Sequence, residues 1–149
     1  MPLEDKVMEQ LKAAMKAKDE AGLRALRAIK AAIIIAKTSE GAGGILNEAD
    51  EVKMLQKLVK QRKDSIEIFT QQNRPELASK EIEEVAIIEQ FLPKQLNEDE
   101  IKQVVTSIIQ STNATTADVG KVIGAANKQL AGQADGKTIA AVVKALLST

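Results

Sequence analysis

The sequence contains no cysteine, histidine, tryptophan or tyrosine, and Phe69 and Phe91 are its only aromatic residues. Without cysteine there is no disulfide scaffold, thiol nucleophile or zinc–thiolate site. Without histidine there is no imidazole base, no Ser–His–Asp triad and no ordinary transition-metal centre. The core must therefore be aliphatic, and we expect no catalytic residues, no metal and no cofactor in the chain.

Neither export nor membrane insertion is indicated by the sequence. The first five residues, Met-Pro-Leu-Glu-Asp, lack the charged-then-apolar pattern of a signal peptide. The most apolar run, 31–36, is far shorter than the roughly 20 residues that span a bilayer. These features predict a cytoplasmic protein with no membrane partner.

Charge is balanced overall but not along the chain. The 21 basic and 21 acidic side chains cancel, which argues against a wholly electrostatic nucleic-acid binder, and we expect no recognition of DNA sequence. Residues 101–149 carry five lysines against Asp118 and Asp135, a net charge of +3. This basic end is compatible with an anionic partner or with an ordinary solvated face.

Apolar residues recur every three or four positions along most of the chain, which predicts helices. Asn47 and Asn97 are expected N-caps, the latter in a capping box. Glycines in 38–44 predict a flexible connector.

No segment alternates as a strand does, so the fold class is all-α. We expect a four-helix N-terminal hairpin or bundle part, 1–93, and a three-helix C-terminal domain, 97–149. The expected helices are 3–18, 20–37, one from Asn47 to about residue 72, 75–91, 98–111, 117–131 and 137–147.

One arginine falls inside an apolar stripe of the third expected helix. Arg62 lies among Leu58, Val59 and Ile66, and an unpaired buried charge would cost several kcal/mol. We expect a buried ion pair with an acid of the following helix, while a role in recognition stays open. The candidate acids are Glu81, Glu83 and Glu84. The lysines on the opposite side are either a solvated face or a phosphate-tracking surface; they are Lys53, Lys57, Lys60 and Lys63.

Glycines and lysines also alternate on one helix of the C-terminal part. Gly120 and Gly124 share a helical face, and each costs roughly 1 kcal/mol relative to alanine. This cost suggests that a second helix or a ligand approaches the backbone closely. Lysines nearby, together with backbone exposed at Gly132 and Gly136, would form a small anion-binding surface. The candidate residues are Gly120, Lys121, Gly124, Lys128, Gly132 and Lys137.

Four segments, taken in order, resemble the YqeY family of small bacterial proteins. The resemblance covers essentially the whole chain. It rests on 60–66 (KQRKDSI), 91–96 (FLPKQL), 120–124 (GKVIG) and 132–136 (GQADG). This family is similar to the C-terminal tail of the B subunit of glutamine-dependent aspartyl/glutamyl-tRNA amidotransferase, and the similarity to that tail is strongest over 97–149.

The resemblance implies a helical module that helps to engage tRNA, and its motif falls on Gly120, Lys121, Gly124, Gly132 and Asp135. The candidate residues above form the expected RNA-binding set. It also associates the chain with carbon–nitrogen ligase activity that uses glutamine as amido-N-donor. However, the chain offers no amidase centre and is too short for the ATP-dependent domain. We therefore expect a tRNA-associated accessory module that is not catalytic alone.

Two other functions stay open at this point. The chain could be a protein–protein adaptor with no RNA role, in which a helical groove receives a partner from the translation machinery. Alternatively, it could be a subunit of an amidotransferase-type complex.

Overall fold

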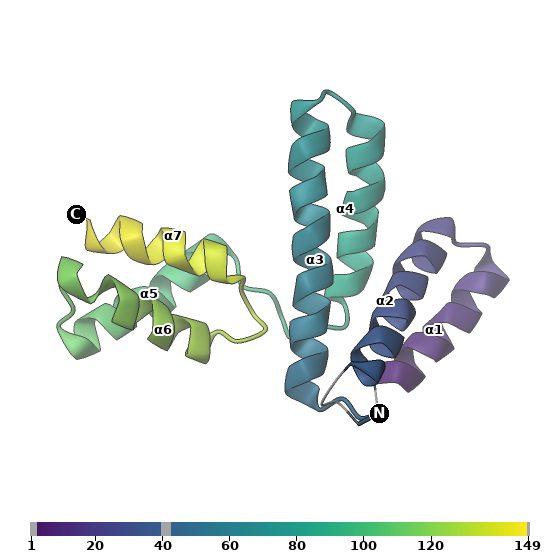
Figure 1. Ribbon diagram of the computed structural model, residues 1–149. Coiled ribbons are helices and arrows are strands. Elements are labelled where there is room, and N and C mark those ends of the chain that lie inside the picture. Colours follow the sequence, from purple (N-terminus) through teal and green to yellow (C-terminus); the bar gives the residue numbers. More distant parts are fainter. Residues whose placement is uncertain (1–2, 40–42, 149) are drawn as a thin grey trace. The chain divides into compact units, whose positions relative to one another are not determined.

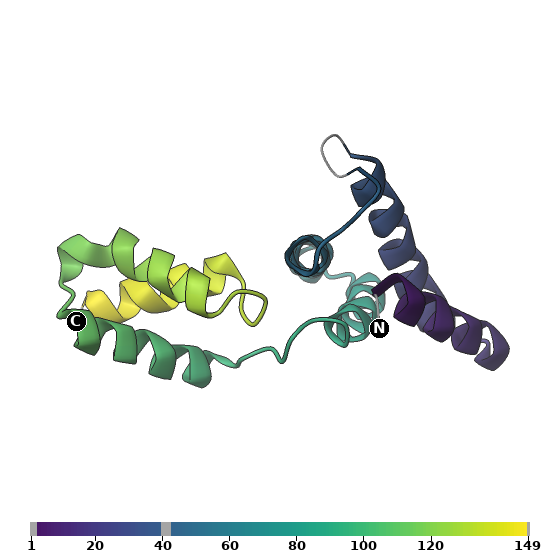
Figure 2. The same ribbon diagram turned by 90° about the horizontal axis from the view of Figure 1, so that it is seen from below.

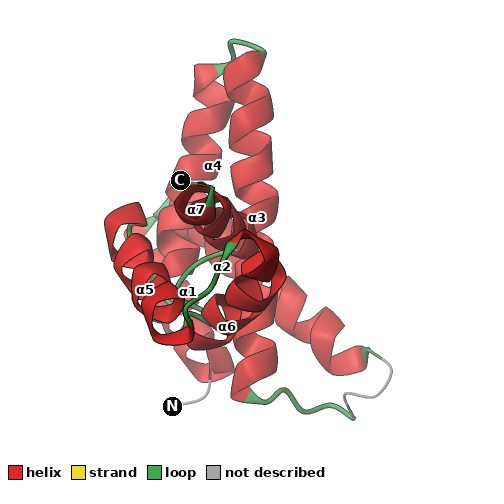
Figure 3. Cartoon of the chain, turned by 90° about the vertical axis from the view of Figure 1, so that its left-hand side faces the viewer, coloured by secondary structure: helices red, strands yellow, loops and turns green. Residues whose placement is uncertain are grey.

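The computed structural model describes residues 3–39 and 43–148, and these residues form only helices, turns and loops (Figure 3). The all-α prediction is therefore confirmed. The chain divides into two compact units, one ending at Leu92 and one beginning at Pro93. No helix within the described ranges is both long and apolar enough to cross a membrane.

The first unit contains α1 (Leu3–Ala17), α2 (Glu20–Thr38), α3 (Glu48–Gln71) and α4 (Pro75–Glu89). Asp19 caps α2 by accepting a hydrogen bond from the Gly22 N–H at 3.0 Å. Asn47 caps α3 in the same way, accepting from the Asp50 N–H at 2.8 Å. Helices α3 and α4 lie side by side as a hairpin (Figure 1). The prediction of the Asn47 cap is confirmed.

A short turn joins α3 to α4. Asn73 takes a left-handed backbone conformation there, with φ of 57°, which asparagine tolerates better than most residues. Pro75 then opens α4 at a position where its missing N–H has no helical partner to lose. The turn thus reverses the chain within a few residues.

Aliphatic side chains from all four helices form the first core. Ile29, Leu55 and Ile88 are its largest fully buried members. The four-residue spacing of Leu3, Val7, Leu11 and Met15 predicts a core stripe on α1, but Met15 is 58% exposed and Ala14 is buried instead. Each helical residue turns the chain by 100°, so a residue four positions on points about 40° past its predecessor. Over the three steps from Leu3 to Met15 the side chains therefore rotate by about 120° away from the core. A step of three at the end keeps Ala14 on the core side.

The apolar spacing of α2 and α4 also predicts that Ile34 and Ile82 belong to the core, but both side chains are exposed. Ile34 and Ile82 are 51% and 54% exposed. Ile34 follows the buried Ile33, and adjacent residues of a helix point about 100° apart. The connector predicted over 38–44 lies partly outside the described residues, of which Gly43 and Gly44 have φ of 60° and 80°.

The second unit contains α5 (Glu98–Thr112), the short 3-10 helix η1 (Thr116–Asp118), α6 (Val119–Gln129) and α7 (Gly136–Leu147) (Figure 2). The predicted capping box is confirmed, since Asn97 and Glu100 each bond the other's backbone N–H. The helix expected from residue 117 instead begins at Val119, after η1. The three α-helices enclose a second aliphatic core, with Ile101, Leu130 and Ile139 fully buried.

Candidate anion-binding surface

The outer face of α6 carries both glycines that the sequence marks. Gly120 and Gly124 are exposed, and a Cβ atom built on either would meet nothing within 4 Å. Of the two alternatives, close packing against another helix therefore does not account for these glycines within the described residues. The backbone of α6 is open to the approach of a ligand along this face.

Two lysines border the glycines on the same helix. Lys121 and Lys128 are both exposed and lie two helical turns apart, about 10.5 Å along the axis. Neither forms an ion pair with any residue in 3–39 or 43–148. We call Gly120, Lys121, Gly124 and Lys128 the α6 face. It presents two unneutralised ammonium groups beside bare backbone.

Lys137 lies in the first turn of α7, which contains no acidic residue. Nearby, a Cβ on Gly136 would lie 3.9 Å from the Asn127 side-chain oxygen. The start of α7 therefore lies beside the C-terminal half of α6, where Lys128 is found. Lysine at a helix N-terminus is electrostatically disfavoured. Asp135 offsets this locally as the N-cap, accepting from the Thr138 N–H at 2.7 Å.

Gly132 differs from the other candidate residues because it is buried. Its φ of 81° is a left-handed conformation that glycine adopts without strain. The Gln95 side-chain amide donates to the Gly132 carbonyl at 2.6 Å. The next residue, Gln133, accepts from the Leu96 N–H at 2.9 Å. The expectation of exposed backbone at Gly132 is wrong, since this glycine forms the turn that holds 95–96 against the loop after α6.

In the first unit, the arginine marked by the sequence is half-buried between α3 and α4. Arg62 Nε lies 3.6 Å from Glu84 Oε1, and these side chains are 15% and 12% exposed. Arg62 Nη1 also donates to the Leu58 carbonyl at 3.1 Å. Of the three candidate acids, Glu84 lies nearest, whereas Glu83 pairs with Arg24 of α2 at 3.1 Å. An acid of α4 thus meets the guanidinium of α3.

No pattern in the sequence indicated that Arg24 belongs to the same cluster. Arg24 Nε lies 3.9 Å from Glu84 Oε2, so one carboxylate is placed between two guanidinium groups. The Nε atoms of Arg24 and Arg62 are buried and have no hydrogen-bond acceptor among the described residues. The two guanidinium groups therefore attract the Glu84 carboxylate by charge, without a well-formed hydrogen bond from either Nε atom. Three helices, α2, α3 and α4, are joined through this cluster.

Glu81 lies at the edge of that cluster. Burial raises the pKa of the Glu81 carboxyl, and repulsion from the Glu84 carboxylate raises it further. Attraction to Arg62 and Arg24 opposes the rise in pKa without cancelling it. The folded structure therefore favours the protonated form of the Glu81 carboxyl more than water does.

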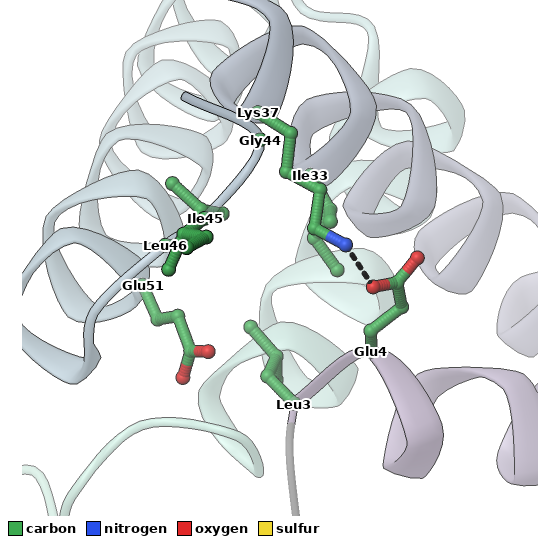
Figure 4. A pocket seen from close by; sticks show the side chains of 8 residues that line it. All are labelled: Leu3, Glu4, Ile33, Lys37, Gly44, Ile45, Leu46 and Glu51. Atoms are coloured by element: carbon green, nitrogen blue, oxygen red, sulfur yellow. Dashed lines mark hydrogen bonds and ion pairs between the residues drawn. The ribbon is translucent and has the colours of Figure 1, made fainter. Parts of the chain in front are cut away.

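A pocket of the first unit also contains a lysine, but that lysine is neutralised. Lys37 forms an ion pair with Glu4, and Leu3, Ile33 and Leu46 supply much of the lining (Figure 4). Glu51 adds a further carboxylate at the side. The pocket thus lacks a free cation. In the described part of the chain, no group of three or more acidic residues could hold a metal ion.

The fold and the α6 face together define an all-helical protein with an open cationic surface. A family model described as Yqey-like protein matches residues 4–147, and the chain therefore belongs to the YqeY family. The resemblance that the four sequence segments indicate is confirmed.

The chain is also similar in sequence to two curated proteins. The chain is 35% identical over 125 residues to "Altered inheritance of mitochondria protein 41, mitochondrial" from Clavispora lusitaniae, covering 81% of this chain and 72% of the relative. It is 29% identical over 132 residues to the protein of the same name from Pyrenophora tritici-repentis, covering 87% and 71%. Neither name mentions tRNA, an amidotransferase or a catalytic activity.

These names correct the predicted localisation. Both relatives are named as mitochondrial proteins, and this finding contradicts the cytoplasmic prediction. The cytoplasmic prediction rested on the first residues and on the absence of a long apolar run, and neither feature distinguishes these compartments.

We expect Arg62→Ala to destabilise the protein by about 3 kcal/mol, because it leaves the Glu84 carboxylate half-buried with a weaker partner. Lys57→Ala, which removes an exposed charge from the same helix, should change the unfolding free energy by less than about 0.5 kcal/mol. Urea denaturation of both variants measures the difference. Equal midpoints would contradict a stabilising role for Arg62.

Glu81→Gln should stabilise the protein at neutral pH. Because the pKa of folded Glu81 is raised, the folded state binds this proton more tightly than the unfolded state. The native group therefore lowers stability as pH rises through its titration range, and glutamine removes that loss. The gain should disappear below the ordinary carboxyl pKa of about 4.3, where glutamate is protonated in both states. Thermal melts of both proteins between pH 3.5 and 7.5 test this, and a gain independent of pH would contradict it.

Proposed function

We propose that this YqeY-family protein is a non-catalytic accessory module that binds tRNA through the α6 face and Lys137. The observation that carries the proposal is the open space over Gly120 and Gly124 beside unpaired Lys121 and Lys128. Two helical glycines cost roughly 1 kcal/mol each, and no packing among the residues that the structure describes offsets that cost. A sugar–phosphate backbone that lies against the helix would offset it.

The chemistry of the face favours contacts with phosphate over contacts with stacked bases. The two phenylalanines of the chain, Phe69 and Phe91, lie in the other unit and are half-buried. Without exposed aromatic platforms, recognition depends on shape, backbone and charge. The similarity to the amidotransferase tail supports tRNA as the RNA in question. In that setting the carbon–nitrogen ligase, with glutamine as amido-N-donor, belongs to other subunits.

The Lys121→Glu/Lys128→Glu variant should weaken tRNA binding at least 10-fold at low salt. Each lost phosphate contact should also lower the slope of log Kd against log salt by about 0.7–0.9, so the double variant should lose about 1.5 or more. Fluorescence anisotropy with labelled tRNA at about 50 and 200 mM salt measures both quantities.

Lys12→Glu/Lys16→Glu is the matched control, since it makes the same change of charge on exposed lysines of α1. This control should bind tRNA within about twofold of the wild type, once its circular dichroism confirms folding. Absence of tRNA binding at low salt would contradict the proposal and favour a protein partner. Equal losses in the two double variants would show non-specific attraction.

Gly120→Ala/Gly124→Ala should change the stability of the protein and its affinity for tRNA in opposite directions. Both added methyl groups have open space, so the variant should unfold with up to about 2 kcal/mol more free energy than the wild type. The same methyl groups should hinder a close ligand backbone and weaken tRNA binding. Ser107→Ala, on the exposed side of α5, is the control that raises helix propensity away from the α6 face. A more stable glycine variant with unchanged tRNA affinity would contradict close approach.

A further inference from the structure

Beside the α6 face lies a small pocket that the family resemblance does not describe. It lies where the end of α5, the turn containing η1 and the start of α6 meet. Its floor is apolar and its rim is polar. The lining residues are Ile108, Thr112, Ala114, Asp118, Lys121, Val122 and Ala125. No signal in the sequence marked the pocket, because its residues come from three separate segments.

The rim combines one cation with hydrogen-bond acceptors. Lys121 belongs both to this rim and to the α6 face. The Oδ2 atom of Asp118 accepts from the Thr115 N–H at 2.9 Å, which leaves Oδ1 available to a ligand. The Thr112 hydroxyl donates to the Ile108 carbonyl at 2.7 Å, so towards a ligand it can only accept. Towards a neutral group the rim therefore offers mainly acceptors, with the lysine beside them.

The apolar part of the lining consists of aliphatic side chains. Val122 and Ile108 are buried, while Ala125 is exposed and Ala114 half-buried. Alanine at 125 leaves room that a larger residue would fill. An apolar hollow with few polar groups at its edge is the usual form of a small-ligand site.

We propose that this pocket holds one unpaired nucleotide of the bound RNA, whose base carries an exocyclic amino group. The base lies on the apolar floor, its amino group donates to Asp118, and its phosphate contacts Lys121. Carboxylates accept hydrogen bonds from the cytosine amino group, while uracil presents a carbonyl oxygen at the same position. Because Lys121 lies on both the pocket rim and the α6 face, a strand following that face reaches the pocket. This inference rests on the proposed tRNA function and adds base selection to it.

Binding of two RNA hexamers, C6 and U6, to the full chain tests the proposal. The two carry the same number of phosphates and bases of similar size, so electrostatic attraction alone should not distinguish them. We expect C6 to bind at least about 10-fold more tightly than U6, as a hydrogen bond to a charged acceptor would give. Fluorescence anisotropy of end-labelled hexamers at low salt measures the ratio.

Three variants identify the pocket as the source of any preference. Ala125→Leu should fill the floor and reduce C6 affinity to that of U6, whereas Ala141→Leu, the same change at an exposed site on α7, should keep the preference. Asp118→Asn retains an acceptor for the Thr115 N–H but adds a donor, and should also abolish the preference. If Ala125→Leu does not fold, Asp118→Asn alone tests whether the pocket causes the preference for C6.

The outcomes separate this inference from the proposed function. Equal affinity for C6 and U6, or a preference that survives both pocket variants, would overturn the nucleotide pocket. If binding of tRNA still depended on salt and on Lys121 and Lys128, the proposed function would stand without it. If neither the hexamers nor tRNA bound at low salt, both would fail.

Discussion

Burial of small aliphatic side chains is the constraint on which the rest of this structure depends. With two phenylalanines and no larger aromatic, the chain forms two separate cores, and each fully buried isoleucine or leucine contributes about 1.5–3 kcal/mol. Such cores close only when every helix turns a continuous apolar stripe inward, since packing supplies most of a helix's stability. The outer faces are then free to differ. On α6, the inward residues Val122 and Ala126 are buried, and the outward ones are glycine and lysine.

The charged cluster of the first unit meets a different requirement. Arg62 and Glu84 interrupt the apolar contact between α3 and α4, and Arg24 brings α2 to the same carboxylate. A pair of this kind is often no more stable than apolar residues of the same volume, although removal of one partner is strongly destabilising. We interpret the cluster as a means of joining three helices in one arrangement. This assigns Arg62 a structural role and leaves the anion-binding role to the second unit.

Local signals in the sequence predicted most of the fold. Asn47 and Asn97 mark helix starts because an N-cap depends on only a few neighbouring residues. The exposure of Ile82 was not predictable in this way, because the contacting faces of α2, α3 and α4 decide it. Gly132 shows the same limit at the candidate site: the sequence marks a glycine, but only the fold shows that its backbone is buried under Gln95. The pocket beside Lys121 is a product of tertiary structure alone.

We propose that the second unit contacts RNA through α6. The most direct test is a map of backbone amide NMR shifts in the full chain as tRNA is added at low salt. We expect the largest changes at the α6 face and at Lys137, with small changes along the lysines of α3, namely Lys53, Lys57, Lys60 and Lys63. Changes concentrated on α3, or a saturating titration that leaves the amides of α6 unmoved, would contradict it.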